Sequence, residues 1–78
     1  MEFHVGDKVI GNSKAKIKYG YTTTGWIGVV IEAGRGGRIV VTDLNDYRRG
    51  TDMSRFKVDI DCFDYYGKMC EDYIAPLF

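Results

Sequence analysis

The sequence predicts an all-β fold, a small barrel of about five short antiparallel strands with a 3-10 turn before the last strand. With 78 residues, the chain is long enough for one compact core. Two runs rich in β-branched residues, 25–32 and 38–42, flank a glycine-rich stretch at 33–37, which is the pattern of a β-hairpin. The other apolar runs are short and separated by turn residues. A closed barrel would bury both faces of such a sheet and leave no free edge.

The first strand is expected within residues 3–12, after a turn at Gly6 and Asp7. Glycine adopts backbone angles that other residues avoid, and an aspartate side chain accepts hydrogen bonds from nearby amides, so the pair favours a tight turn. His4, the only histidine, is expected to be partly exposed beside this turn. Because no serine or cysteine lies in a recognisable nucleophile motif, no catalytic role is predicted for it.

The run at 26–31 is apolar on both of its faces, because successive strand residues point to opposite sides. We therefore expect this strand to be central in the sheet and covered on both sides. Gly28 is expected to allow a bend or bulge. Trp26 is expected to be partly buried in the core, with a surface recognition role as the alternative. The glycines at 34, 36 and 37 do not lead into a helix and no Gly-Lys-Ser/Thr follows, which argues against a nucleotide-binding loop.

Residues 13–24 are predicted to form a long polar connection. Lysines occupy positions 14, 16 and 18, and Tyr19 and Tyr21 follow them. One interpretation is a basic loop with tyrosines at its tip, which contacts phosphates and stacks on bases or on a peptide. The other is a solvated edge whose alternating lysines prevent pairing with other molecules, with one tyrosine folded onto the core.

A second polar loop is predicted at 43–52, and it carries Arg48 and Arg49 beside Tyr47. Its acidic residues lack the spacing of a calcium-binding loop. Polar and apolar residues then alternate over 53–58, which predicts a strand with Phe56 and Val58 facing inward.

The chain from 59 to 66 is expected to complete the barrel, so that residues 1–66 form the domain. A short helical turn is predicted at 59–63, with Asp59 at its N-cap and with Ile60 and Phe63 facing the core. Residues 64–66 are expected to be the last strand. Residues 67–78 are expected to be a C-terminal tail with an apolar end, either packed on the barrel or mobile.

Composition argues against several classes of function. The net charge is zero, but residues 1–58 carry an excess of lysine and arginine, and residues 59–78 an excess of aspartate and glutamate. Cys62, Cys70 and His4 are too few for a four-ligand zinc site, so no metal and no cofactor is predicted. Neither a nucleophile–base pair nor a phosphate-binding loop is found, so we expect no enzyme and no small-molecule substrate.

No apolar run approaches the length of a membrane helix, and no basic segment followed by an apolar one marks a secretory signal. A cytoplasmic protein without a membrane partner is therefore expected. In that compartment Cys62 and Cys70 are expected to be reduced, with a disulfide between them as the alternative.

Four stretches carry a resemblance to a known fold: residues 5–9 (VGDKV), 24–30 (TGWIGVV), 38–41 (RIVV) and 56–59 (FKVD), the last together with Cys62 and Phe63. They resemble the SH3-like barrels, in particular the KOW-type barrels of ribosomal and transcription proteins and the repeats of the mind-bomb type. Small uncharacterised proteins of bacteria and their phages share the features of the second group. The resemblance spans residues 3–66. The KOW type implies contact with RNA through loops next to the Gly28 strand, and the mind-bomb type implies binding of a peptide segment from another protein.

Two hypotheses for function follow. The first is a non-enzymatic interaction module that binds a protein or peptide partner through exposed aromatic residues. The alternative is KOW-like binding of nucleic acid, RNA in particular, through a basic face that contains tyrosines. The candidate binding surface consists of Lys14, Lys16, Lys18, Tyr19, Tyr21, Trp26, Tyr47, Arg48 and Arg49.

Overall fold

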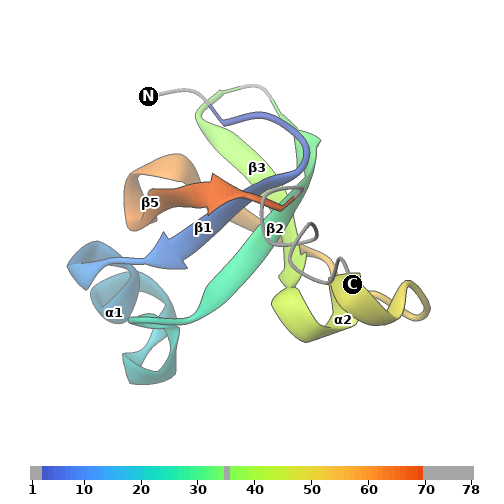
Figure 1. Ribbon diagram of the computed structural model, residues 1–78. Helices are drawn as coiled ribbons and strands as arrows, with labels where there is room; N and C mark the ends of the chain where they lie inside the picture. The colour runs from blue at the N-terminus through green and yellow to red at the C-terminus, as the bar shows by residue number, and fades with distance from the viewer. Residues whose placement is uncertain (1–2, 35, 70–78) are drawn as a thin grey trace.

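The computed structural model describes residues 3–34 and 36–69, and this part of the chain is mostly β. Five antiparallel strands form one sheet in the order β4-β3-β2-β1-β5. The strands are β1 (Asp7–Gly11), β2 (Ile27–Ala33), β3 (Arg38–Asp43), β4 (Phe56–Asp59) and β5 (Phe63–Lys68). The sheet is strongly twisted, so that β5 at one edge runs at a large angle to β3 on the other side of the sheet centre (Figure 1).

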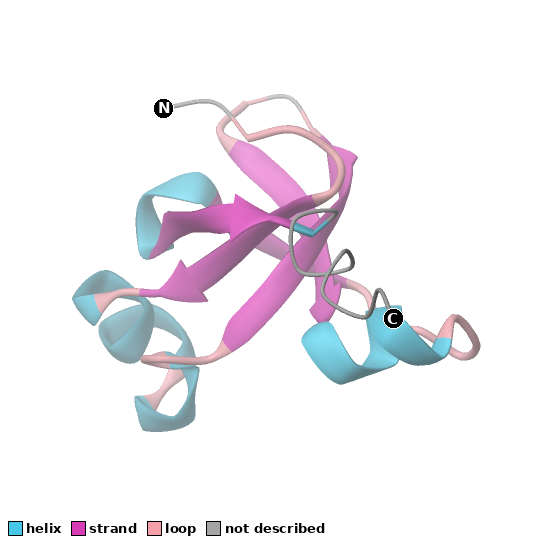
Figure 2. Cartoon of the chain, in the orientation of Figure 1, coloured by secondary structure: helices cyan, strands magenta, loops and turns pink. Residues whose placement is uncertain are grey.

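The all-β class and the number of strands agree with the prediction, but the described strands do not close into a barrel. Hydrogen bonds join only neighbours in the strand order, so β4 and β5 are the two edges of the sheet. The two helices and the 3-10 turns lie at the ends of the strands (Figure 2). Neither helix of the described chain has the length and apolar character that a membrane span requires.

Strand β2 is central, as predicted, and lies between β1 and β3. Val29 and Val30 point to opposite faces of the sheet, and both are fully buried. The pairing of β2 with β3 is irregular between Val30 and Glu32. The bulge that was expected at Gly28 therefore lies further along the strand.

The role of Gly28 is instead to leave room for a neighbouring ring. A Cβ atom at this position would lie 2.7 Å from two ring atoms of Trp26 and 2.9 Å from the backbone oxygen of Thr42. Both distances are shorter than any ordinary carbon contact. Only glycine lets the indole of Trp26 lie directly on the strand.

One face of the sheet carries the hydrophobic core. Val58, Ile60 and Phe63 contribute to it, as the sequence predicts, whereas Phe56 is 48% exposed. The buried members are Phe3, Val9, Ala15, Val30, Ile39, Val41, Val58, Cys62 and Phe63, with Trp26 and Ile60 packed against them.

The prediction of a long polar loop at 13–24 is wrong, because this stretch contains helix α1 (Ser13–Tyr19) and the 3-10 turn η1 (Tyr21–Thr23). The side chain of Asn12 caps α1 by accepting a hydrogen bond from the amide of Lys14 at 2.9 Å. Ala15 is buried against the core. The basic residues of the last turn stabilise the helix, because their positive charges interact favourably with the negative end of its dipole. The alternating lysines therefore lie on a helix and not on a strand edge.

The prediction of a polar loop at 43–52 is also wrong in part, because residues 44–49 form helix α2 (Leu44–Arg49). The carboxylate of Asp43 accepts a hydrogen bond from the amide of Asn45 at 2.9 Å and caps the helix. Gly50 ends it in the left-handed conformation, at φ +77°.

Strand β4 begins at Phe56, three residues later than predicted. The side chain of Ser54, which precedes it, is hydrogen bonded to the hydroxyl of Thr42 and to the amide of Asp43, each at 3.1 Å. The amide of Ser54 donates to the carboxylate of Asp46. These bonds tie the chain before Phe56 to α2 and the end of β3, and so delay the start of the strand.

The 3-10 turn η2 (Ile60–Cys62) and the last strand follow as predicted. Asp59 precedes η2 but its side chain does not cap it. Strand β5 continues to Lys68, two residues beyond the expected end, and Met69 is buried. The remainder of the expected tail, residues 70–78, lies outside the described residues.

We predict that Gly28→Ala lowers the free energy of unfolding by about 1–3 kcal/mol, because the new methyl group overlaps a ring and a backbone oxygen that cannot both move away. Denaturant unfolding measures the change. Ala33→Ser, at the exposed end of the same strand, is the control and is expected to change stability by less than about 0.5 kcal/mol. Equal losses in the two variants would contradict this role of Gly28.

Candidate functional site

Trp26, immediately before β2, is the centre of the candidate site. Its ring is half-buried over Gly28, and its Nε1 donates a hydrogen bond to Oδ2 of Asp43 at 2.9 Å. Because the other oxygen of this carboxylate caps α2, Asp43 holds the indole and the helix in one arrangement. The partial burial predicted for Trp26 is confirmed.

Two phenylalanines meet the indole edge-on. Phe56 on β4 has its ring centroid 5.9 Å from that of Trp26, and Phe63 on β5 has its centroid at 6.1 Å. The interplanar angles are 83° and 73°, which is the favourable geometry for aromatic pairs. Since β4 and β5 are the two edges of the sheet, the ring of Trp26 joins them through side chains where no backbone pairing does.

An open groove of about 580 Å³ lies beside these rings. Phe56, at 48% exposure, and Tyr19, at 38%, present aromatic surface to solvent there. The groove is lined by Tyr19, Thr22, Thr23, Trp26, Arg55, Phe56, Lys57, Val58 and Phe63. It therefore runs between η1 on one side and β4 on the other.

Asp59, at the end of β4, holds α1 against the groove. Its amide donates to the hydroxyl of Tyr19 at 3.2 Å, and its carboxylate pairs with Lys18 and with Nε of Arg38. The hydrogen bond from Lys18 lowers the pKa of the Asp59 carboxyl below the ordinary aspartate range. The same bond raises the pKa of Lys18.

Two further cations lie beside the groove, Arg55 immediately before β4 and Lys57 within it. Arg55 pairs with Glu32 on β2. Lys57 is exposed, and no ion pair to it is found among residues 3–34 and 36–69. The rim of the groove on this side is therefore basic.

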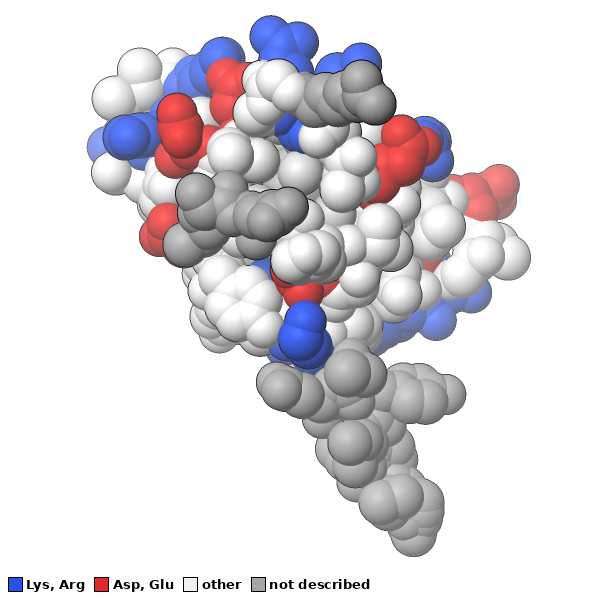
Figure 3. Space-filling view, turned by 90° about the horizontal axis from the view of Figure 1, so that it is seen from above, with Lys and Arg blue, Asp and Glu red and all other residues white. Residues whose placement is uncertain are grey.

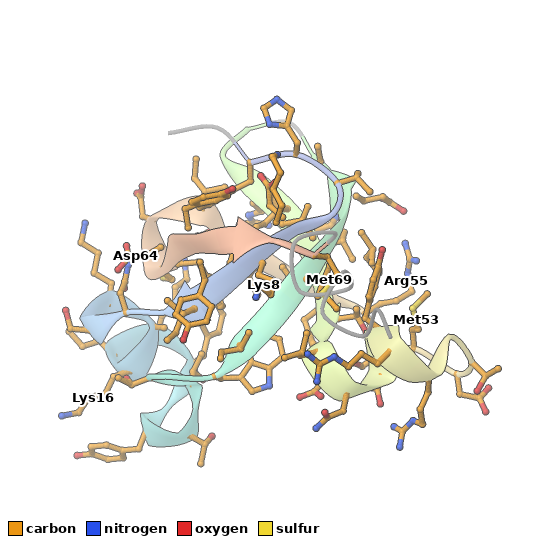
Figure 4. All side chains as sticks on the ribbon, viewed as in Figure 1. Lys8, Lys16, Met53, Arg55, Asp64 and Met69 are labelled. Atoms are coloured by element: carbon orange, nitrogen blue, oxygen red, sulfur yellow. The ribbon has the colours of Figure 1, made fainter. Side chains whose placement is uncertain are left out.

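The residues predicted as one binding surface fall into two groups. Lys14, Lys16, Lys18 and Tyr19 lie on α1 and Tyr21 on η1, whereas Tyr47, Arg48 and Arg49 lie on α2. Figure 1 shows α1 and α2 apart from each other, on either side of β2 in that view. Figure 4 shows the same separation between Lys16 and Met53, which follows α2. Of the predicted residues, the groove brings together Tyr19 and Trp26.

Several of the predicted cations have partners within the chain. Lys18 pairs with Asp59, Arg49 pairs with Asp46, and the ammonium of Lys16 lies 4.8 Å from the centre of the Tyr21 ring. On the face shown in Figure 3, Lys and Arg side chains lie beside Asp and Glu side chains and do not form one continuous basic area.

The β4 side of the site is not evident from the sequence. The sequence predicts Phe56 in the interior and does not indicate Lys57 or Phe63 as binding residues, yet all three line the groove. The alternation over 53–58 identifies a strand, but it does not indicate whether that strand is an edge. The signal that was present is the pair Arg55 and Lys57, whose charges suit an exposed edge.

Metal and thiol chemistry receive no support from the described part of the chain. No group of three or more metal-ligating side chains is found there. Cys62 is a buried free thiol, and burial raises its pKa, so it is protonated at neutral pH. Its predicted alternative partner, Cys70, lies outside the described residues.

Comparisons of this chain with protein-family models, with curated proteins and with solved structures found no match.

We predict that Lys18→Met raises the pKa of Asp59 toward the ordinary aspartate range, because it removes the main hydrogen bond to that carboxylate. The folded pKa of Asp59 is depressed, so its contribution to stability is present above the unfolded pKa and is lost as pH falls through the folded pKa. The variant is therefore expected to lose less stability than the wild type on acidification through that range. Carboxyl-carbon NMR titration measures the pKa.

Lys14→Met is the matched control on the same helix, because no ion pair to Lys14 is found among the described residues. It should leave the titration of Asp59 unchanged. An unaltered Asp59 titration in Lys18→Met would contradict the assignment of the ion pair.

Proposed function

We propose that this chain is a non-enzymatic interaction module, related in fold to the SH3-like barrels, whose aromatic groove binds an extended peptide segment of a protein partner. The observation that carries the proposal is the pairing of an open groove with half-exposed aromatic rings, Phe56 and Tyr19, beside the single tryptophan of the chain. Aromatic anchors of this kind dominate the binding energy of protein interfaces.

The order of the elements supports the fold relationship. Four strands follow one another across the sheet, and β5 returns beside β1 after the 3-10 turn η2. The contacts of Trp26 with Phe56 and Phe63 bring the two edge strands together, which is the approach that a small barrel requires.

The size and lining of the groove favour a peptide over the nucleic-acid alternative. At about 580 Å³ it is as large as sites that take drug-sized ligands, roughly 300–1,000 Å³, and an extended peptide can place one or two side chains in it. A phosphate backbone needs a continuous basic track, whereas the predicted cations lie on two separate helices and several are paired with acids.

The test is selection of binding peptides from a random library of extended peptides without tryptophan, on the immobilised chain. Because Trp26 is the only tryptophan, its fluorescence reports directly on binding in the groove. We predict that Phe56→Ala weakens binding of a selected peptide at least about tenfold, since a central anchor contributes about 2 kcal/mol or more. Tyr65→Ala is the matched control, because Tyr65 is 47% exposed and does not line the groove.

Thr22→Phe provides a second variant if Phe56→Ala does not fold. Thr22 is exposed at the wall of the groove, and the larger side chain should obstruct the site and reduce binding to a similar degree. Full binding by both groove variants would overturn the proposal. Salt-sensitive binding of a mixed-sequence oligonucleotide, with no peptide selected, would favour the nucleic-acid alternative instead.

A further inference from the structure

The outer edge of β4 has a defined hydrogen-bonding direction. The amide of Ile60 donates to the carbonyl oxygen of Gly37 at 3.0 Å, toward β3. The amide of the preceding residue, Asp59, donates to the hydroxyl of Tyr19 at 3.2 Å, away from β3. In an antiparallel pair, successive residues direct their backbone groups alternately to the partner strand and away from it.

This alternation identifies Lys57 as the next residue that faces outward. The pairs Val40↔Lys57 and Ile39↔Val58 continue the register that ends at Gly37 and Ile60. Val58 therefore bonds to β3, while the amide and carbonyl of Lys57 point to the open side, as those of Asp59 do. Tyr19 occupies the outward amide at Asp59, so among residues 3–34 and 36–69 the part of the β4 edge left without a backbone partner is short and centred on Lys57.

The charge beside this edge is positive. The carboxylate of Asp59 is shared by Lys18 and Arg38, so that cluster keeps one positive charge. Arg55 and Glu32 balance each other, and Lys57 adds a second uncompensated charge within the described chain. An acidic partner is therefore favoured over a basic one.

We propose that the partner is a short, acidic, extended peptide that adds as a further strand to the outer edge of β4 and exchanges backbone hydrogen bonds with Lys57. The proposal rests on the function proposed above and names the chemistry of the partner. Directly opposed residues of neighbouring strands share a face. The peptide residue opposite Lys57 thus meets a cation, while its neighbours face the groove beside Phe56 and Val58.

The pattern expected of the partner is alternation of acidic and apolar residues. Acidic side chains lie on the face of Lys57 and Arg55, and apolar or aromatic side chains enter the groove. Addition of a strand to a free sheet edge is a common mode of peptide recognition, in which main-chain hydrogen bonds give affinity and pockets for alternate side chains give specificity.

The experiment compares two capped peptides of about seven residues, one alternating Glu with Phe or Val and the other with Lys in place of each Glu. Binding is followed by Trp26 fluorescence and by amide chemical shifts. We expect the acidic peptide to bind at least about tenfold more tightly, and the largest shifts to fall on β4. Equal binding of the two peptides would overturn the charge assignment.

Two substitutions at one position separate charge from backbone bonding. Lys57→Gln removes only the charge, and the affinity for the acidic peptide should fall by less than about fivefold. Lys57→Pro also removes the outward amide, and proline is tolerated where an edge amide faces solvent. Loss of that hydrogen bond should weaken binding by a further factor of about five. Identical affinities of the two variants would overturn the strand addition.

A change in the peptide gives the same information if Lys57→Pro does not fold. Methylation of the backbone nitrogen of each residue in turn should weaken binding most at the position that pairs with Lys57 and leave the two adjacent positions unaffected. Uniform tolerance would overturn the inference. Selected peptides that bind the groove without using the β4 edge would defeat this inference alone, whereas failure to select any peptide would defeat the proposed function as well.

Discussion

The indole of Trp26 is the contact on which the rest of the structure depends. It can lie on the sheet only because Gly28 has no side chain, and its orientation is set by the hydrogen bond to Asp43. The same carboxylate caps α2, and the indole makes T-shaped contacts with a phenylalanine from each of the two outermost strands. One side chain thus joins the centre of the sheet to both of its edges and to a helix.

An open sheet must protect its edges from pairing with other chains, and this chain does so unevenly. At the end of β4, Tyr19 and Lys18 on α1 cover the backbone and side chain of Asp59. Two residues earlier along the same edge, Lys57 is exposed beside the groove. An exposed cation at a sheet edge repels strands that carry positive charge but still allows an acidic strand to pair. Lys57 can therefore both protect the β4 edge from non-specific pairing and select an acidic partner.

Local patterns were sufficient for the strands and insufficient for the helices. β-branched runs bounded by glycines predict β2 and β3, because extended backbone and tight turns are local properties. Helices α1 and α2 have only six or seven residues, and their stability comes from caps at Asn12 and Asp43 and from packing. A short polar sequence with such caps closely resembles a loop, which explains both incorrect assignments.

The site was predictable only where its residues act locally. Tyr19 and Trp26 are predictable from the sequence, because Tyr19 directly follows a run of lysines and Trp26 is the single tryptophan. Phe56 and Phe63 become site residues only when β4 and β5 approach Trp26 from distant parts of the chain. This long-range origin has a kinetic consequence: the groove cannot form until β4 and β5 have both reached Trp26, and contacts of high sequence separation are slow to form. We expect binding competence to arise in one step with the global transition, and newly synthesised chains to become able to bind only after β5 has left the ribosome.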